Sequence, residues 1–445
     1  MDSSRLNWLS ACDAAQAIRD GSISAEALVA ACLARVREID AQVQAWAFLN
    51  PEHALAQARA ADELRKSGAP TGPLHGVPVG IKDIFDTADM PTEDGTVLHA
   101  GRTPPADASV VARLRAAGAV IMGKTVTTEL ATYRPGKTRN PHNSEHTPGG
   151  SSSGSAAAVA CGMVPLAIGS QTNGSVIRPA AYCGVYGFKP THGLISRHGV
   201  LKLSRTLDHV GVFARSIEDV ALACEELAAH DAHDPDTRPM ARVPFARITA
   251  EEPPLPPRLA LVKTPLWDRT EPQTREAFEE LAAHLGGRVE EFALPDNARD
   301  VLQWHRTVME AEMAANLAAE YEKGRDQLSE SLRAQLERGR QSSAFDYQAA
   351  LARIPQVIEG FHRIFDRYDA IVTPSAAGTA PRGLQSTGDP MFCTLWTFAG
   401  MPALNLPIMQ SENGLPLGVQ LVGARHDDAR LLRTARWLAN AVESS

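Results

Sequence analysis

Apolar residues near the start of the chain recur at the spacing of an α-helix. Ser24 is a suitable helix N-cap, and the residues that follow it on one helical face are Ala27, Leu28, Ala31, Cys32 and Val36. This period of 3.6 residues is typical of a helix packed on a core. We therefore expect the first seventy residues to be helical.

From residue 73 the pattern changes to short apolar runs separated by Gly and Pro. Residues 77–81 and 119–123 predict buried strands, and residues 110–117 predict a helix between them. The same order of strand, helix and strand returns at residues 259–262, 272–285 and 289–292. This alternation is typical of an α/β fold. A helical stretch over 300–367 and a strand over 369–374 follow.

Composition and charge narrow the class of protein. The chain has 445 residues, 44% of them hydrophobic and 22% charged, so it has enough apolar residues for a sizeable core. Its net charge is −8, and it has no run of basic residues of the kind that phosphate binding needs, which excludes a nucleic-acid partner. The chain has no apolar run of 18 residues and no signal-like start, so we expect a cytoplasmic protein with no membrane partner. Its six cysteines form no CxxC pair and predict neither disulfides nor a metal site.

The most unusual segment is the Gly/Ser run at residues 147–155. An isolated run of this kind would be a flexible linker, but this one leads into an Ala-rich stretch without charge from 156 to 170. A glycine-rich turn that enters a helix presents backbone N–H groups to an anion or to a developing oxyanion. We therefore expect the run to be part of a functional site.

Three kinds of chemistry compete for this segment. A phosphate-binding loop is excluded, because no Lys follows the glycines. The pattern GxSxG at 150–154 would make Ser152 a nucleophile, yet no strand precedes it and His362 and His426 have no distinguishing context. The third arrangement uses Ser175, at the end of another small-residue turn, and Lys82, at the end of an apolar strand. Burial lowers the pKa of a lysine, and the neutral amine is then a usable general base.

Several long motifs resemble the amidase signature family. They are the Gly/Ser/Ala run at 149–160 with Ser175 downstream, the segment RPAAYCGVYGFKPT at 178–191, the lysine motif at 76–83, and the C-terminal blocks at 369–374 and 417–423. The resemblance implies one large mixed β-sheet, flanked by helices on both faces. From the resemblance together with the apolar spacing and the prolines of 234–257, we expect an N-terminal helical segment (1–70), a core with the catalytic motifs (71–233), a Pro-rich linker (234–257), a substrate-side region (258–365) and the C-terminal part of the sheet (366–445).

The resemblance also implies a Ser–cisSer–Lys triad. Carried over by position, Ser175 is the nucleophile, Ser151 the bridging serine after a cis Gly150–Ser151 bond, and Lys82 the base. The oxyanion would be held by the backbone N–H groups of Thr172, Asn173, Gly174 and Ser175. The family needs no metal and no organic cofactor.

The activity that follows is hydrolysis of C–N bonds in small amides, with aryl carbamates (urethanes) and esters within reach of the same acyl-enzyme chemistry. We expect a small-molecule substrate and a monomer or homodimer. One alternative is the glutaminase-like subunit of a tRNA-dependent amidotransferase, although Gln171 stands where that subunit has Asp. A second is a non-catalytic binding module, which the presence of all three triad residues disfavours.

The chain departs from the family pattern near the nucleophile. Asn173 stands where glycine is usual, and Asn tolerates a positive φ better than most residues, so we expect this conformation rather than a substrate contact. Arg178 follows Ser175 by three residues instead of two, and Ser153 replaces a glycine. These departures concern the oxyanion turn and the substrate preference, and they leave the triad intact.

Candidate pocket residues are fewer and less distinctive. The candidates for an apolar acyl or aryl pocket are Gln171, Tyr133, Trp304, Met391, Phe392 and Trp396, although such aromatic residues more often pack in a core. His142 and His146 flank Glu145 in a sequence that is not HExxH, which argues against zinc. Residues 296–365 resemble the family least, so we expect substrate specificity to be determined there.

Overall fold

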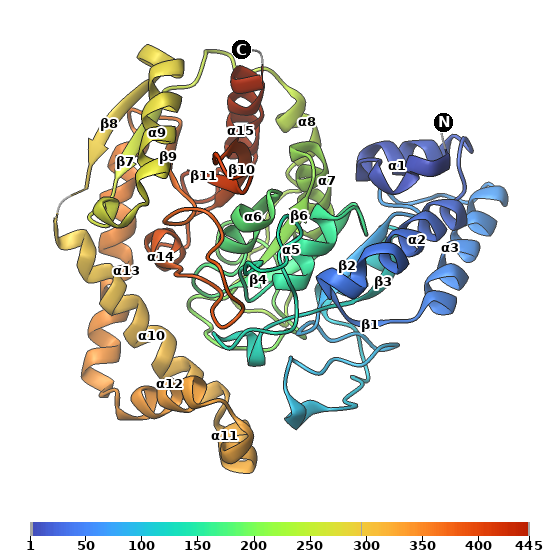
Figure 1. Cartoon of the computed structure of the whole chain (residues 1–445), viewed down its shortest axis with the longest axis horizontal. Coiled ribbons are helices and arrows are strands. Elements are labelled where there is room, and N and C mark those ends of the chain that lie inside the picture. The colour runs from blue at the N-terminus through green and yellow to red at the C-terminus, as the bar shows by residue number, and fades with distance from the viewer. Residues whose placement is uncertain (1–2, 295, 444–445) are drawn as a thin grey trace.

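The computed structural model describes residues 3–294 and 296–443. In these residues, one mixed sheet of eleven strands forms the centre of the molecule (Figure 1). The strands are β1 (Trp46–Leu49), β2 (Pro78–Lys82), β3 (Val120–Thr125), β4 (Leu166–Gln171), β5 (Tyr186–Lys189), β6 (His209–Ala214), β7 (Leu259–Lys263), β8 (Val289–Ala293), β9 (Ala370–Pro374), β10 (Ala403–Gln410) and β11 (Pro416–Val422). Their order across the sheet is β1-β3-β2-β4-β6-β5-β10-β11-β9-β7-β8.

Helices cover both faces of this sheet, as the resemblance implies. They are α1 (Ala11–Arg19), α2 (Ala25–Val43), α3 (Pro51–Lys66), α4 (Ser109–Ala116), α5 (Ser153–Ala160), α6 (Ile177–Cys183), α7 (Ile217–Leu227), α8 (Phe245–Ala250), α9 (Pro272–Leu285), α10 (Asp300–Asn316), α11 (Ala318–Gly324), α12 (Glu330–Gln341), α13 (Ala344–Phe365), α14 (Met391–Phe398) and α15 (Asp428–Glu443). The pair α5 and α6 lies on one face of the central strands, and the pair α7 and α15 lies on the other. The predicted fold class is confirmed.

The central strands place the catalytic motifs together. β2 runs parallel to both β3 and β4, with Ile81 of β2 opposite Ile168 of β4. The carboxyl ends of β2 and β4, which carry Lys82 and Ser170, therefore meet at one edge of the sheet. Ligands of open α/β sheets bind outside this edge.

Most predicted elements are confirmed within a few residues. The helix predicted at 272–285 is α9, and Ser24 caps α2 by accepting a hydrogen bond from the N–H of Ala27. The expectation that the first seventy residues are all helical is wrong, because Trp46–Leu49 forms edge strand β1, which pairs antiparallel with β3. This run of four residues lies between the left-handed residue Gln44, which ends α2, and Asn50, which caps α3.

The Pro-rich segment at 234–257 contains more structure than a free linker. It holds the short helix α8, whose first residue, Phe245, is 1% exposed. α8 packs against α7 and α15. The strands that precede this segment in the chain and the strands that follow it therefore belong to one sheet.

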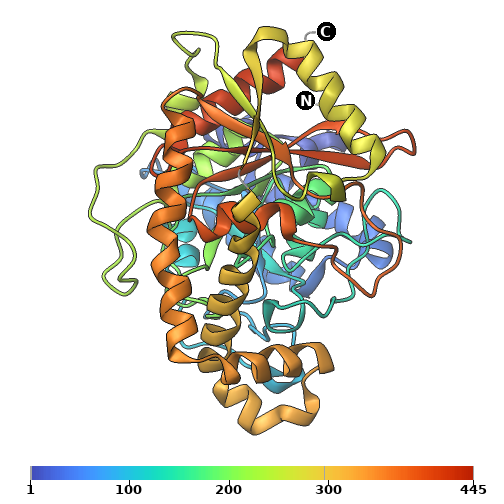
Figure 2. The same cartoon turned by 90° about the vertical axis from the view of Figure 1, so that its left-hand side faces the viewer.

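The stretch predicted to be helical from 300 to 367 forms an arm beside the sheet. α10 and α13 run along each other, and α11 and α12 lie at the far end of the arm (Figures 1 and 2). α10 also packs against α12 and α14, so it connects the arm to the core. Within the described ranges, no helix is both long and apolar enough to cross a membrane.

Candidate active site

Lys82 is the last residue of β2 and is fully buried. Its Nζ donates hydrogen bonds to Ser151 Oγ (2.7 Å) and to Ser170 Oγ (2.8 Å). Burial lowers the pKa of the Lys82 amine well below its usual value, and the nearby carboxylate of Asp208 opposes this shift only in part. A neutral amine in contact with a hydroxyl group can act as a general base at neutral pH.

Ser151 lies in the turn that leads into α5. The Gly150–Ser151 peptide bond is cis, as the resemblance implies. Gly149 has φ +81°, and a Cβ at this position would lie 2.8 Å from the backbone of Pro179, so only glycine fits. The guanidinium of Arg178 donates to the carbonyl oxygen of Gly150 (2.7 Å) and thereby fixes the peptide next to Ser151.

The side chain of Ser152 forms hydrogen bonds with the backbone of β4. Its Oγ donates to the carbonyl oxygen of Ser170 and accepts the N–H of the same residue, each at 3.2 Å. Ser152 is fully buried, and no strand leads into its turn. The structure therefore gives Ser152 a position that fits a structural role and not a nucleophile elbow.

Ser175 is half-buried and ends the turn between β4 and α6. Among the described residues, none accepts a hydrogen bond from the backbone N–H groups of Thr172, Asn173, Gly174 or Ser175. The next two N–H groups, of Val176 and Ile177, both donate to the side chain of Gln171. The turn thus presents unpaired donors next to the Ser175 hydroxyl, which is the arrangement that stabilises an oxyanion.

The two serines do not contact each other directly in this conformation. No described residue forms a hydrogen bond with Ser175 Oγ, and Ser151 Oγ receives its hydrogen bond from Lys82. Catalytic hydrogen bonds are often long without substrate and shorten in the substrate complex. We therefore expect the contact between Ser175 and Ser151 to form when substrate binds.

A partly buried carboxyl group, that of Asp208, holds the turn at 172–175. Asp208 accepts hydrogen bonds from Thr172 Oγ1 (2.7 Å) and from the backbone N–H groups of Leu203 and Ser204 (both 2.9 Å). Burial raises the pKa of Asp208 to about 6, although these hydrogen bonds favour its charged form. On the other side of the turn, His305 Nε2 of α10 donates to the carbonyl oxygen of Thr172 (3.0 Å). Burial lowers the pKa of His305 to about 4, so it is neutral at pH 7.

The expectation that Asn173 has a positive φ is wrong. Its side chain instead accepts a hydrogen bond from Thr394 Oγ1 (2.7 Å) and donates one to the hydroxyl of Tyr133 (3.4 Å). Its carbonyl oxygen accepts a hydrogen bond from Thr397 Oγ1 (2.6 Å). Asn173 therefore connects the oxyanion turn to α14, and its carboxamide lies on the wall of the cavity that contains Ser175.

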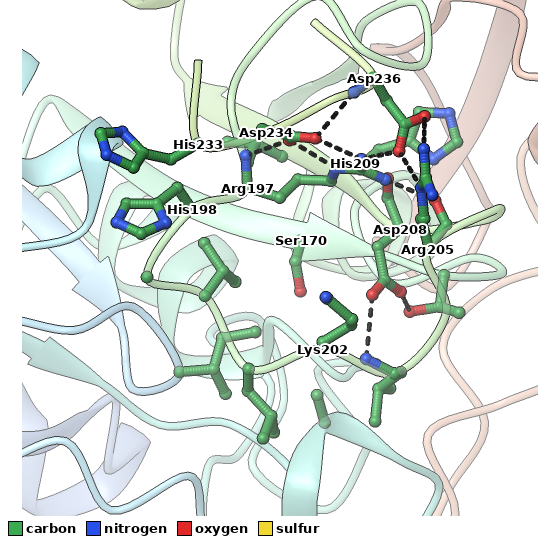
Figure 3. Close-up of a pocket in the computed structure, with 18 of the residues that line it drawn as sticks. Ser170, Arg197, His198, Lys202, Arg205, Asp208, His209, His233, Asp234 and Asp236 are labelled. Carbon is green, nitrogen blue, oxygen red and sulfur yellow. Dashed lines mark hydrogen bonds and ion pairs between the residues drawn. The ribbon is translucent and has the colours of Figure 1, made fainter. Parts of the chain in front are cut away.

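We call this space the nucleophile cavity, and it also takes in the whole oxyanion turn. Its other walls include Tyr133, Arg178, Met309, Met313 and Gln335. A second cavity reaches Ser170 and Asp208 from a different side, and it shares Ala131, Thr172 and Leu203 with the first. Figure 3 shows the Ser170 hydroxyl pointing into this second cavity, whose outer wall carries ion pairs of Arg197 with Asp234 and of Arg205 with Asp236. Ser170, one of the two serines that accept a hydrogen bond from Lys82, thus lines a different cavity from the one that contains Ser175.

The predicted pocket residues fall into two groups. Tyr133 lines the cavity that contains Ser175, and Met391 lines a cavity that adjoins it. The other four are placed elsewhere: Phe392 is buried, Trp396 packs on Phe361 (4.9 Å between ring centres), Trp304 lies near Phe398, and Gln171 binds the first N–H groups of α6. These four are not among the cavity-lining residues near Ser175, and core packing accounts for the three aromatic ones.

Sequence reasoning missed the residues that α10 and α12 contribute to the cavities. Met309 lies on α10, and Gln335 and Arg338 lie on α12. The sequence carries little signal for this face of α10, because three of its five residues (302, 305, 306, 309 and 310) are His, Arg and Glu instead of apolar residues.

His142 and His146 do not point to a metal centre. His142 Nε2 lies 2.9 Å from the carbonyl oxygen of Cys183, and His146 Nδ1 lies 2.7 Å from that of Ala380. In residues 3–294 and 296–443, no group of three His, Cys, Asp or Glu side chains is placed to hold a metal ion.

Comparison with known proteins agrees with this geometry. The family model described as Amidase matches residues 27–432. The chain is 36% identical to a subunit of glutamyl-tRNA(Gln) amidotransferase from Chloroflexus aggregans, over 96% of this chain and 95% of the relative. The solved structure of peptide amidase from Stenotrophomonas maltophilia superposes with a TM-score of 0.85 at 30% identity, covering 98% of this chain and 97% of that one. That of 6-aminohexanoate cyclic dimer hydrolase superposes with a TM-score of 0.87 at 28% identity, with the same coverage. The chain therefore belongs to the amidase signature family of hydrolases that act on C–N bonds.

Proposed function

We propose that the protein is a stand-alone amidase that hydrolyses small linear amides through an acyl-enzyme on Ser175. Aryl carbamates and esters are included in the proposal, because the same acyl chemistry applies to them. The observation that carries it is the buried amine of Lys82, 2.7 Å from Ser151 Oγ, beside a turn of unpaired N–H groups that ends in Ser175. A base, a relaying hydroxyl and an oxyanion site are what hydroxyl nucleophiles require.

The proposed acylation step moves one proton along the triad. Ser175 Oγ attacks the substrate carbonyl carbon and gives its proton to Ser151, whose own proton passes to the neutral amine of Lys82. The carbonyl oxygen becomes an oxyanion and accepts hydrogen bonds from the turn at 172–175. When the C–N bond breaks, the relay returns the proton to the leaving nitrogen, because an amine anion is too basic to leave.

Deacylation repeats the same sequence with water as the nucleophile. Water gives a proton to the relay, attacks the acyl-enzyme, and releases a carboxylic acid and Ser175. With a carbamate, the intermediate would be a carbamoyl-enzyme, and hydrolysis would yield CO2, an amine and an alcohol. Apart from the substrate and water, each step uses side chains and backbone groups of this chain.

The second candidate is the glutaminase-like subunit of a tRNA-dependent amidotransferase. It is favoured by the 36% identity to the glutamyl-tRNA(Gln) amidotransferase subunit over nearly the whole of both chains. Such a subunit would use the same three residues to release ammonia from glutamine within a complex. Gln171 argues against it, since its side chain binds Val176, Ile177 and Thr397, where the subunit has an Asp.

A turnover screen of the purified protein separates these functions. The panel contains a p-nitroanilide, a simple aryl amide, an aryl carbamate, a p-nitrophenyl ester and glutamine, with Ser175→Ala as the blank. Hydrolysis of the anilide or of the carbamate without a partner protein is the expected result. Turnover of glutamine alone would replace the proposal with the amidotransferase function.

A further inference from the structure

A third cavity continues from the nucleophile cavity toward the surface. The two share Tyr133, Asn173, Met309 and Gln335 as lining residues. Three arginines also line the outer part, so we call it the arginine cavity: they are Arg269, Arg306 and Arg338. A substrate whose carbonyl group lies at Ser175 would extend one of its ends into this space.

Arg306 is an exposed residue of α10 that lines the arginine cavity. The residues of this helix that line the arginine cavity are Leu302, His305, Arg306, Met309 and Glu310, and their spacing places them on one helical face. His305, Met309 and Glu310 are buried. Arg306 itself is exposed, as is Arg269, so both can meet a charged group that enters the cavity from solvent.

The three arginines differ in their partners. Arg338 forms a two-point ion pair with Glu310 (Nε to Oε2, 3.0 Å), so its charge is balanced. Arg269, at the end of the 3-10 turn η4 (Trp267–Arg269), and Arg306 form no ion pair with any residue that the structure describes. Two unbalanced guanidinium groups therefore face this cavity from two different elements.

The other walls define what can bind between these arginines. Leu302, Met309 and Met391 supply apolar contact. Asp389 lies on the wall formed by α14 and its preceding turn, and its carboxylate accepts only the N–H of Met391. An anion would be repelled from the wall that carries Asp389 and attracted to the wall that carries Arg306 and Arg269.

We propose that the arginine cavity binds a carboxylate group carried by the substrate, with Arg306 and Arg269 as its recognition residues. The inference rests on the proposed amidase function and adds a substrate class to it: amides with a short alkyl or aryl segment that ends in a carboxylate. The planar fork of a guanidinium matches the two oxygens of a carboxylate. The apolar side chains contact the segment between that carboxylate and the scissile bond.

The test compares substrates of equal shape and different charge. The first pair is the p-nitroanilide of glutaric acid and that of 5-methylhexanoic acid, in which an isopropyl group replaces the carboxylate. The second pair places the charge on the amine side: N-acetyl-4-aminobenzoate and N-acetyl-4-isopropylaniline. Both members of a pair have the same kind of amide bond to an aromatic amine. The rate at which this amine is released gives kcat/KM for each substrate.

The wild-type protein should prefer the charged member of one pair by about fivefold to tenfold, since exposed ion pairs contribute modestly. Arg306→Ala should remove most of this preference and Arg306→Lys should retain part of it. The matched control is Arg363→Ala, which removes an exposed arginine of α13 that lines none of these cavities. Added salt should reduce the preference in the wild type.

Two outcomes would overturn the inference. One is equal turnover of both members of each pair, with no effect of Arg306→Ala, which leaves the amidase function intact. The other can arise only if no member of either pair is hydrolysed. That result would contradict the proposed amidase function, and the carboxylate site would then be tested by binding alone. Binding of the glutaric p-nitroanilide to Ser175→Ala is then measured by calorimetry, and unchanged binding in the Ser175→Ala/Arg306→Ala protein would exclude the carboxylate site.

Discussion

At the scale of single residues, the two neighbouring serines of the Gly/Ser turn have different surroundings. Ser151 Oγ contacts the Lys82 amine, whereas Ser152 Oγ contacts only the backbone of Ser170. The hydrogen-bond partners in the fold therefore distinguish two neighbouring serines, either of which could have a catalytic role on the evidence of the sequence alone. Ser175 differs from both, since it is half-buried and faces a cavity.

Substitution of these serines should separate their roles. Ser175→Ala should lower kcat by at least ~10^3-fold, because the proposed nucleophile is lost. Ser152→Ala should retain at least about a tenth of the activity, because it removes only two long hydrogen bonds to the backbone of Ser170. Steady-state kinetics on the best substrate of the panel, with circular dichroism to check folding, measures both. The reverse order of effects would restore Ser152 as the nucleophile.

The pH dependence of activity should report the pKa of Lys82. The proposed mechanism needs the neutral amine, so Lys82→Ala should be inactive near neutral pH, and the wild-type rate should rise as pH passes the lowered pKa.

The negative charge of Asp208 raises the pKa of Lys82. Asp208→Asn, which has the same shape, should therefore lower it further and move the acid limb of kcat/KM to lower pH. An acid limb that stays in place would show that Asp208 does not tune the base.

At the scale of elements, the site is built where two parallel strands end and two helices begin. β2 and β4 bring Lys82 next to Ser170, and the turns before α5 and α6 supply Ser151 and Ser175. The side chain of Gln171 closes the N-terminus of α6 by accepting the N–H groups of Val176 and Ile177. The start of the helix is thus fixed directly behind the oxyanion turn.

Removal of this cap should cost stability as well as activity. Gln171→Ala leaves two buried N–H groups without a partner, and each such loss costs about 1–3 kcal/mol. We expect a lower midpoint of urea unfolding and a lower kcat, because the turn at 172–175 is no longer held from behind. Gln171→Glu, which keeps an acceptor oxygen for both N–H groups, should retain more of the unfolding free energy than Gln171→Ala. Equal stability of both variants would exclude the capping role.

Elements and motifs differ in how far the sequence predicts them. The strands that become β2 and β7 and the helix that becomes α9 could be predicted, because their apolar spacing is local. The positions proposed for the triad could be found as well, since each lies in a contiguous motif. β1 was missed, because four residues between two helices carry too little periodicity. The arginine cavity could not be predicted, because Arg306, Arg269 and Asp389 are far apart in sequence and meet only through the packing of α10.

At the scale of the whole molecule, the helical arm and the sheet meet at the candidate active site. His305 of α10 donates to the carbonyl oxygen of Thr172, so one buried contact joins the arm to the oxyanion turn. The contact needs a proton on Nε2, which the neutral imidazole of His305 carries in one of its two tautomers. Burial lowers the pKa of His305 from 6.5 to about 4, which connects the stability of the fold to pH.

The sign of this dependence follows from proton binding. Between about pH 6.5 and pH 4 the unfolded chain protonates His305 and the folded protein does not, so acid favours unfolding in this range. His305→Gln keeps an N–H donor for Thr172 but does not titrate. Urea unfolding at pH 7 and at pH 5 should therefore show a smaller loss of unfolding free energy in the variant than in the wild type. Other titrating groups, Asp208 among them, are common to both proteins and largely cancel in the difference. Equal losses would mean that the pKa of His305 is the same in the folded and the unfolded chain, so that His305 does not connect stability to pH.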